Sequence, residues 1–190
     1  SNTKSTPLPA SAATPAYSTG ETPVDPSGAL LGASLEYKNG GLYLGAGYHT
    51  IERLTEGDDK EMAFGAGYNF GAFEIKGNWM KAELEGAGNA VNPEYTNANI
   101  GASYAVGANK FFLNFQQQKL DNTDAKGNTV SVSYTYSLSK RTNIYTTYAQ
   151  LRNNSRGAFG INASSNNVTP PATGLGAGPK VFTVGLRHSF

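Results

Sequence analysis

PKVFTVGLRHSF, residues 179–190, closes the chain and alternates between two kinds of residue. Successive side chains of a β-strand point to opposite faces of a sheet, so a period of two indicates a strand whose faces meet different surroundings. The last residues of soluble domains are commonly frayed and polar. An amphipathic strand that runs to a terminal Phe therefore favours a sheet embedded in a membrane. The large residues of one face are Phe182, Val184, Leu186, His188 and Phe190.

The same alternation recurs through most of the upstream sequence. Apolar and aromatic residues alternate with Gly, Ser, Asn and charged residues over runs of about 10, the length that a tilted strand needs to cross a hydrocarbon core. We therefore predict an all-β fold, an antiparallel transmembrane β-barrel with about nine strands present. The strands are expected over residues 29–38, 41–51, 61–70, a run that begins at 73, 95–106, 110–120, 128–138, 142–153 and 181–190.

One strand cannot be oriented from its pattern. In residues 142–153, Ile144 and Tyr148 compete with Tyr145 and Leu151 for the apolar face. Its facing is left open.

The connections are expected to alternate between short and long. Short turns are predicted at Asn39-Gly40, at Gly71, and over 107–109 and 139–141. Longer polar loops are predicted over 52–60, 85–94, 121–127 and 154–178. Barrels in the outer membrane have short periplasmic turns and long extracellular loops, which orients the sheet. Residues 1–27 lack periodicity and are predicted to be an irregular extracellular loop or tail, whereas residues 28–190 hold the transmembrane strands.

Composition removes several classes of function. The 190 residues include no Cys and carry a net charge of +1, so nothing supports a disulfide framework, a thiolate metal site or nucleic-acid binding. No apolar run approaches the roughly 18 residues of a spanning helix. His49 and His188 fall on opposite faces by strand parity, which gives catalysis little support. We predict no enzyme activity, no cofactor and no metal.

Outward-facing aromatic residues gather near the short-turn ends of the strands. Such residues form the interfacial girdles of membrane barrels, where one end of the ring contacts hydrocarbon and the other contacts headgroups. The predicted girdle consists of Tyr37, Tyr68, Phe70, Phe73, Tyr104, Phe111, Tyr136 and Phe190.

Two motifs give the chain a family resemblance: LSKRT at 138–142, followed by IYTTYAQLRN, and VGLRHSF at 184–190. Through them residues 28–190 resemble the Gram-negative general porins of the β-proteobacterial type. The resemblance implies an outer-membrane barrel of about sixteen strands, assembled as a homotrimer in lipid, which passes small hydrophilic solutes. It also implies that the barrel-assembly machinery recognises the terminal strand through Phe182, Val184, Leu186, His188 and Phe190.

The predicted strand number departs from this family. Closed single-chain barrels use even numbers of strands, whereas about nine are visible here. We interpret the chain as the C-terminal half of a porin that lacks roughly seven strands. The family's inward-folded constriction loop would then belong to the other half.

Strand parity also predicts the residues that would line a pore. Opposed charges across a water-filled lumen create a field that discriminates between ions. The charged candidates are Glu36, Lys38, His49, Glu74, Lys76, Lys110 and Arg187. The polar wall is expected to consist of Asn99, Ser103, Asn114, Gln116, Ser133 and Thr135.

Two other functions are compatible with a β-rich chain. One is an outer-membrane barrel that acts as an adhesin, receptor or structural anchor, with residues 154–178 as its binding surface. The other is a soluble sandwich or lipocalin-like binder, whose core would require neither a level aromatic girdle nor a terminal Phe. An inward face rich in Gly, Ser and Asn favours the open channel over the adhesin or receptor barrel.

Overall fold

The computed structural model describes residues 29–52, 57–85, 93–163, 166–168 and 174–190. The irregular segment expected at 1–27 and most of the loop expected at 85–94 lie outside these ranges. Among the described residues, no helix is long and apolar enough to cross a membrane.

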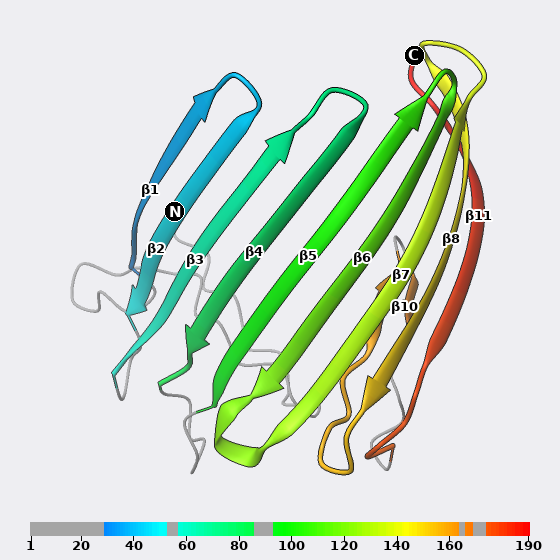
Figure 1. Cartoon of the computed structure of the whole chain (residues 1–190). Helices are drawn as coiled ribbons and strands as arrows, with labels where there is room; N and C mark the ends of the chain where they lie inside the picture. Colours follow the sequence, from blue (N-terminus) through cyan, green and yellow to red (C-terminus); the bar gives the residue numbers. More distant parts are fainter. Residues whose placement is uncertain (1–28, 53–56, 86–92, 164–165, 169–173) are drawn as a thin grey trace, which may run out of the picture.

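The described chain forms one antiparallel sheet of nine strands, as the alternation predicted. Each strand pairs with the next along the chain, except that β8 pairs with β11 (Figure 1). The strands are β1 (Leu30–Asn39), β2 (Leu42–Glu52), β3 (Asp58–Asn69), β4 (Phe73–Glu83), β5 (Glu94–Val106), β6 (Asn109–Leu120), β7 (Ala125–Ser137), β8 (Thr142–Asn153) and β11 (Lys180–His188).

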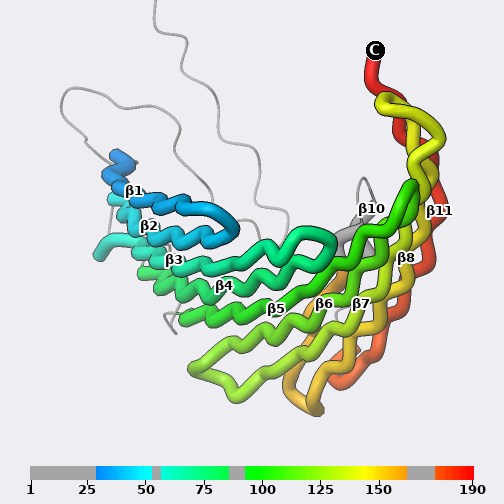
Figure 2. Tube along the Cα trace, turned by 45° about the horizontal axis from the view of Figure 1, so that its top comes forward, coloured from blue at the N-terminus to red at the C-terminus, as the bar shows by residue number. Residues whose placement is uncertain are grey.

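The sheet is strongly curved. Figure 2 shows it bent into a trough, with β1 along one rim and β11 along the other. These two strands are the edges of the described sheet, and neither pairs with the other. Curvature of this kind is how a twisted antiparallel sheet becomes the wall of a barrel.

The register separates two faces of different chemistry. One row of directly paired outward residues crosses β1 to β4 and consists of Leu35, Ala46, Phe64 and Trp79. This outer face is uncovered: Leu35 is 75% exposed, Phe64 54% and Phe182 69%. A soluble protein rarely leaves so large an apolar surface in water, whereas a barrel places it against lipid.

The register settles the strand whose facing the sequence left open. Tyr148 lies opposite Phe182, and Ile144 lies opposite Leu186, so both share the outer face of β11. Tyr145 and Leu151 consequently face inward. Leu151 is apolar on a mostly polar face because another part of the chain covers it completely.

Three predicted connections need correction. The first hairpin turns at Gly40-Gly41 instead of Asn39-Gly40, because Asn39 pairs with Leu42 and only Gly40 has positive φ, at 56°. The loop expected over 121–127 shrinks to 121–124, since β7 begins at Ala125 and η1 (Asp121–Thr123) fills the turn. The loop expected over 52–60 shrinks likewise, because β3 begins at Asp58. The contrast between short and long connections is therefore weaker than predicted.

A short hairpin within residues 154–178 was not predicted. β9 (Ile161–Ala163) pairs with β10 (Asn166–Val168). Figure 2 shows this hairpin on the hollow side of the trough. The polar, Gly-rich composition of the segment concealed strands that are only three residues long.

Candidate functional site

The hollow face of the sheet is polar and carries the candidate channel residues. One row of directly paired residues crosses all nine strands, from β1 to β11. Its members are Lys38, Tyr43, Gly67, Lys76, Gly101, Asn114, Ser131, Ala149 and Val181. Neighbouring rows hold the other predicted charged and polar residues. The structure therefore brings every predicted pore residue to one face.

A cluster on β1 and β2 combines two charges with an aromatic ring. The Lys38 Nζ atom lies 3.1 Å from Glu36 Oε2 and 5.3 Å from the centre of the Tyr43 ring. The Tyr43 hydroxyl donates a hydrogen bond of 3.3 Å to Glu36 Oε1. The Tyr43 ring fills the space over Gly45, where a Cβ would come within 2.8 Å of its hydroxyl. The glycine thus allows the ring to lie flat along the wall.

A second charged pair lies on β4. The Lys76 Nζ atom is 2.8 Å from Glu74 Oε1. The Lys76 chain packs over Gly67, its direct partner on β3. Lys76 is three strand spacings from Lys38 along the row, or about 14 Å. The two pairs therefore place separate positive and negative charges on the same wall.

Uncharged polar residues tie neighbouring strands together. Asn99 and Asn114 exchange hydrogen bonds of 3.0 and 3.1 Å between their side-chain amides. Ser133 and Thr147 share a bond of 2.8 Å. Of the remaining candidates, Ser103 is buried between Glu74 and Phe112 in its row, Gln116 lies opposite Asn99 and Thr129, and Thr135 lies opposite Lys110 and Tyr145.

The other predicted charges lie nearer the ends of the strands. The His49 Nε2 atom is 3.8 Å from Glu61 Oε2 on β3. The Lys110 Nζ atom lies 5.0 Å from the centre of the Phe112 ring. Arg187 faces inward opposite Asn143 near the end of β11. These charges are spread over the wall and do not converge on one point, which suits a conduit better than a substrate site.

The segment after β8 is anchored to the inner wall by Asn153. Its Nδ2 donates to the carbonyl oxygens of Phe159 and Ala177, at 3.0 and 2.8 Å, and its Oδ1 accepts the Phe159 N–H at 3.0 Å. Phe159 and Ile161 then pack against Leu151 and Ala149. The described part of this loop therefore occupies lumen-side space. Sequence reasoning missed the anchor, because the facing of residues 142–153 was left open and Leu151 could not be recognised as an apolar residue on the polar face.

Gly127 makes room for this anchor. A Cβ at Gly127 would lie 2.9 Å from the Phe159 ring and 3.0 Å from both Asn153 Oδ1 and a Leu151 methyl. We expect Gly127→Ala to lower the free energy of unfolding by about 1–3 kcal/mol, because the enclosed site cannot expand freely. Urea midpoints of the refolded full-length protein would measure this. Gly47→Ala is the control, since its nearest neighbour is 3.9 Å away, and equal losses in both variants would contradict the packing argument.

Three inward-facing aromatic rings were not among the predicted pore residues. Tyr43, Phe112 and Tyr145 occupy positions that alternation marks as polar. The Tyr145 ring covers Gly185, its direct partner on β11. A ring over a cross-strand glycine fills what would otherwise be a gap in the wall.

The terminal residues proposed as an assembly signal remain accessible. Phe182, Val184 and Leu186 are exposed on the outer face. His188 Nδ1 lies 2.8 Å from the Thr142 hydroxyl, and its ring contacts the Phe190 ring edge-on at 4.9 Å between centres. Recognition of these residues by the assembly machinery stays a prediction.

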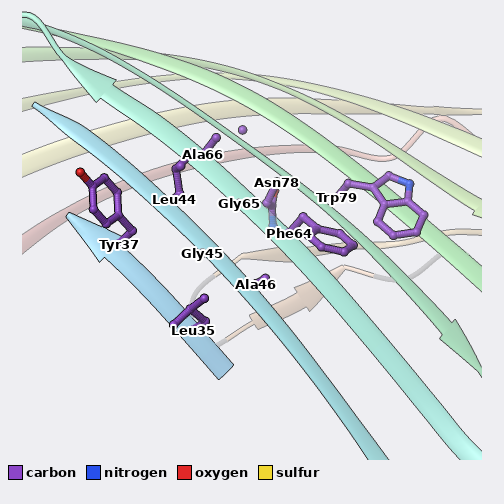
Figure 3. Close-up of a pocket in the computed structure, with 11 residues that line it drawn as sticks. Leu35, Tyr37, Leu44, Gly45, Ala46, Phe64, Gly65, Ala66, Asn78 and Trp79 are labelled. Carbon is purple, nitrogen blue, oxygen red and sulfur yellow. The ribbon is translucent and has the colours of Figure 1, made fainter. Parts of the chain in front are cut away.

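A hollow of about 630 Å³ lies on the apolar outer face of the sheet, on the side opposite the candidate pore residues. Figure 3 shows Leu35, Tyr37, Leu44, Phe64 and Trp79 around it. It forms because small outward residues, Ala46, Ala66 and Gly77, stand beside these large ones. An apolar hollow on the outer surface suits a lipid chain and is unrelated to passage of a polar solute.

The fold resembles that of solved outer-membrane proteins. OmpT of Vibrio cholerae, folded in vitro and solved in a trimer form, matches with a TM-score of 0.61 and 16% identity over 84% of this chain and 55% of that one. A second structure of OmpT gives a TM-score of 0.53 and 13% identity over 83% and 63%. At these identities the likeness concerns the fold alone.

Sequence comparison identifies the family. Outer membrane porin protein 32 of Delftia acidovorans is 28% identical over 172 residues, which cover 87% of this chain and 48% of that protein. The chain thus spans about half the length of this curated relative. The profile of the family described as Gram-negative porin matches residues 10–156. The chain is therefore an outer-membrane protein that belongs to the Gram-negative porin family.

Proposed function

We propose that the chain is the C-terminal half of the wall of a sixteen-stranded, trimeric channel, through which small hydrophilic solutes and ions diffuse passively. The observation that carries this proposal is the division between the two faces of the curved sheet. The outer face is apolar and uncovered, whereas the hollow face holds the charged pairs Glu36–Lys38 and Glu74–Lys76.

Passive diffusion requires a wall that solutes contact without being held. Several polar side chains of the wall already have a hydrogen-bond partner, as in the reciprocal Asn99–Asn114 bonds. A passing solute therefore exchanges water for weak contacts of similar strength. The separate positive and negative side chains add a transverse field that orders water and favours one sign of ion.

The open edges support the half-barrel proposal. Unpaired backbone N–H and C=O groups in hydrocarbon cost several kcal/mol each, so a membrane sheet must close. Strands from the rest of the protein would pair with β1 and β11. Trimerisation is proposed by analogy, since one structural neighbour is described in a trimer form.

The loop after β8 supports a channel over a loop-mediated receptor. A receptor would present residues 154–178 to the outside. Its described part instead packs through Phe159 and Ile161 on the inner wall. In that position it narrows the lumen at the end where the longer connections lie.

Single-channel recording on the full-length protein tests the proposal. We expect stepwise currents in groups of three. Lys76→Glu removes a positive charge and places a second carboxylate beside Glu74, so the cation-to-anion permeability ratio should rise about threefold; Glu74→Lys should lower it similarly. Lys140→Glu, in the β7–β8 turn, is the control. A correctly folded barrel that does not conduct would refute the proposal. So would an equal cation-to-anion permeability ratio in Lys76→Glu, Glu74→Lys and the control Lys140→Glu.

A further inference from the structure

The inner wall divides into a charged part and a nearly neutral part. On β1 to β4 the inward titratable residues are Glu36, Lys38, His49, Asp59, Glu61, Glu74 and Lys76. On β5 to β8, Lys110 near a strand end is the only charged residue that faces inward among those that the structure describes. These four strands therefore present a surface of uncharged polar groups to the lumen.

Side-chain amides are concentrated on β5 and β6, in the middle of the sheet (Figure 1). The amide patch, as we call it, consists of Asn97, Asn99, Asn114, Gln116 and Gln118. Asn97 pairs directly with Gln118 and Asn99 with Gln116, whereas Asn114 lies opposite Gly101. Both strands have a neighbour on each side, so the amide patch is complete without the strands that would join β1 and β11.

The Asn99–Asn114 pair holds two of these amides in fixed orientations. Their reciprocal hydrogen bonds, at 3.0 and 3.1 Å, use one N–H of each amide. A carboxamide has two N–H donors and an oxygen that accepts two hydrogen bonds, so each amide keeps one donor and one acceptor position. A solute can bind these positions without first ordering the side chains, which lowers the entropic cost of contact.

The other members of the amide patch lie beside this pair. Asn97, Gln116 and Gln118 are half-buried, and within the described residues their amides make no side-chain hydrogen bond. Each therefore offers donors and acceptors to the lumen. A hydroxyl group also donates one hydrogen bond and accepts others, so an array of amides matches a neutral polyhydroxyl solute. An ion is bound more strongly by groups of opposite charge, which the amide patch lacks.

Aromatic rings border the amide patch at both ends along the channel axis. Tyr95 occupies the inward position next to Asn97 at the long-loop end and is 38% exposed. Phe112 occupies the inward position next to Asn114 at the other end and is 37% exposed. The amide rows between them cover about 14 Å, enough for two sugar rings. Small-molecule sites combine apolar contact area with a few polar groups, and the C–H face of a sugar ring is apolar.

We propose that the amide patch and its two flanking rings form a weak binding site for neutral sugars. The inference rests on the proposed channel and gives it a second, uncharged path beside the charged pairs of β1 to β4. The affinity is low, because a solute that crosses the channel must leave the site as well as enter it.

The test measures how sucrose, a neutral disaccharide, reduces the potassium chloride current through single channels of the full-length protein. Sucrose at the site obstructs the lumen, so the reduction should saturate with its concentration. Gln116→Leu with Gln118→Leu should raise the half-saturating concentration about tenfold, because each lost amide removes a hydrogen bond to the solute. Gln117→Leu is the matched control and should leave it unchanged, because Gln117 lies on the same strand but faces outward, where it bonds Asn128.

A polyethylene glycol of equal mass separates recognition from simple filling of the lumen. It carries hydroxyls only at its ends, so its effect on the wild-type current should rise without saturation. Equal saturation by both solutes, or an unchanged half-saturating sucrose concentration in the double Leu variant, would overturn the inference. The current without added solute tests the channel itself. A conducting barrel that does not respond to sucrose refutes the sugar site alone, whereas a folded barrel that carries no current refutes the channel and the sugar site together.

Discussion

The 190-residue chain produced by itself is expected to aggregate instead of forming a membrane-inserted barrel. Its sheet has two long edges, β1 and β11, whose outer backbone groups pair with nothing in the described chain. Every residue of β1 is exposed, including Leu30, Leu31 and Leu35. Open edges are not tolerated in lipid, and in water a long exposed apolar edge strand pairs with other chains.

Refolding into detergent micelles, followed by electrophoresis with and without heating, measures this outcome. The full-length protein should show the heat-dependent shift of a closed barrel, whereas the chain alone should show none. Supplying the preceding strands as a separate polypeptide should restore the shift, because both edges then gain partners. Recovery of a stable, heat-modifiable monomer from the 190 residues alone would contradict the half-barrel proposal.

Asn153→Ala should release the loop after β8 from the inner wall. The substitution removes three side-chain hydrogen bonds. The Phe159 carbonyl oxygen and N–H lose this partner, whereas the Ala177 carbonyl oxygen keeps the backbone N–H of residue 153 at 3.4 Å. At about 1 kcal/mol for each bond, the expected loss in the free energy of unfolding is about 3 kcal/mol. A freed loop should also make the single-channel current larger and noisier, because it no longer holds one position in the lumen.

Asn143→Ala provides the matched control. Asn143 is the same residue type on the same face of β8, near the short-turn end and away from the loop. It should change neither the urea midpoint nor the current noise. If both variants conduct alike, the loop after β8 does not narrow the channel.

Local sequence rules were sufficient to predict most of the strands and the face on which most of their residues lie. Alternation follows from the geometry of the extended chain, so the outward Phe182, Val184 and Leu186 and the inward Glu74 and Lys76 could be assigned from parity alone. Gly and Asn near the strand ends located the hairpins to within a residue or a few. Nine strands and their pairing order followed, because consecutive strands joined by short turns pair with each other.

Tertiary contacts decided what alternation cannot encode. Leu151 faces inward because Phe159 and Ile161 cover it, a contact that requires the loop to fold back. Lys126 lay in the loop predicted over 121–127, and its pairing with Lys119 became evident only because β7 begins at Ala125. The sequence by itself determined the two faces of every strand except β8, since side-chain direction is a local property of the backbone. Only the folded sheet decided which residues meet across strands, because register and loop placement depend on contacts between distant segments.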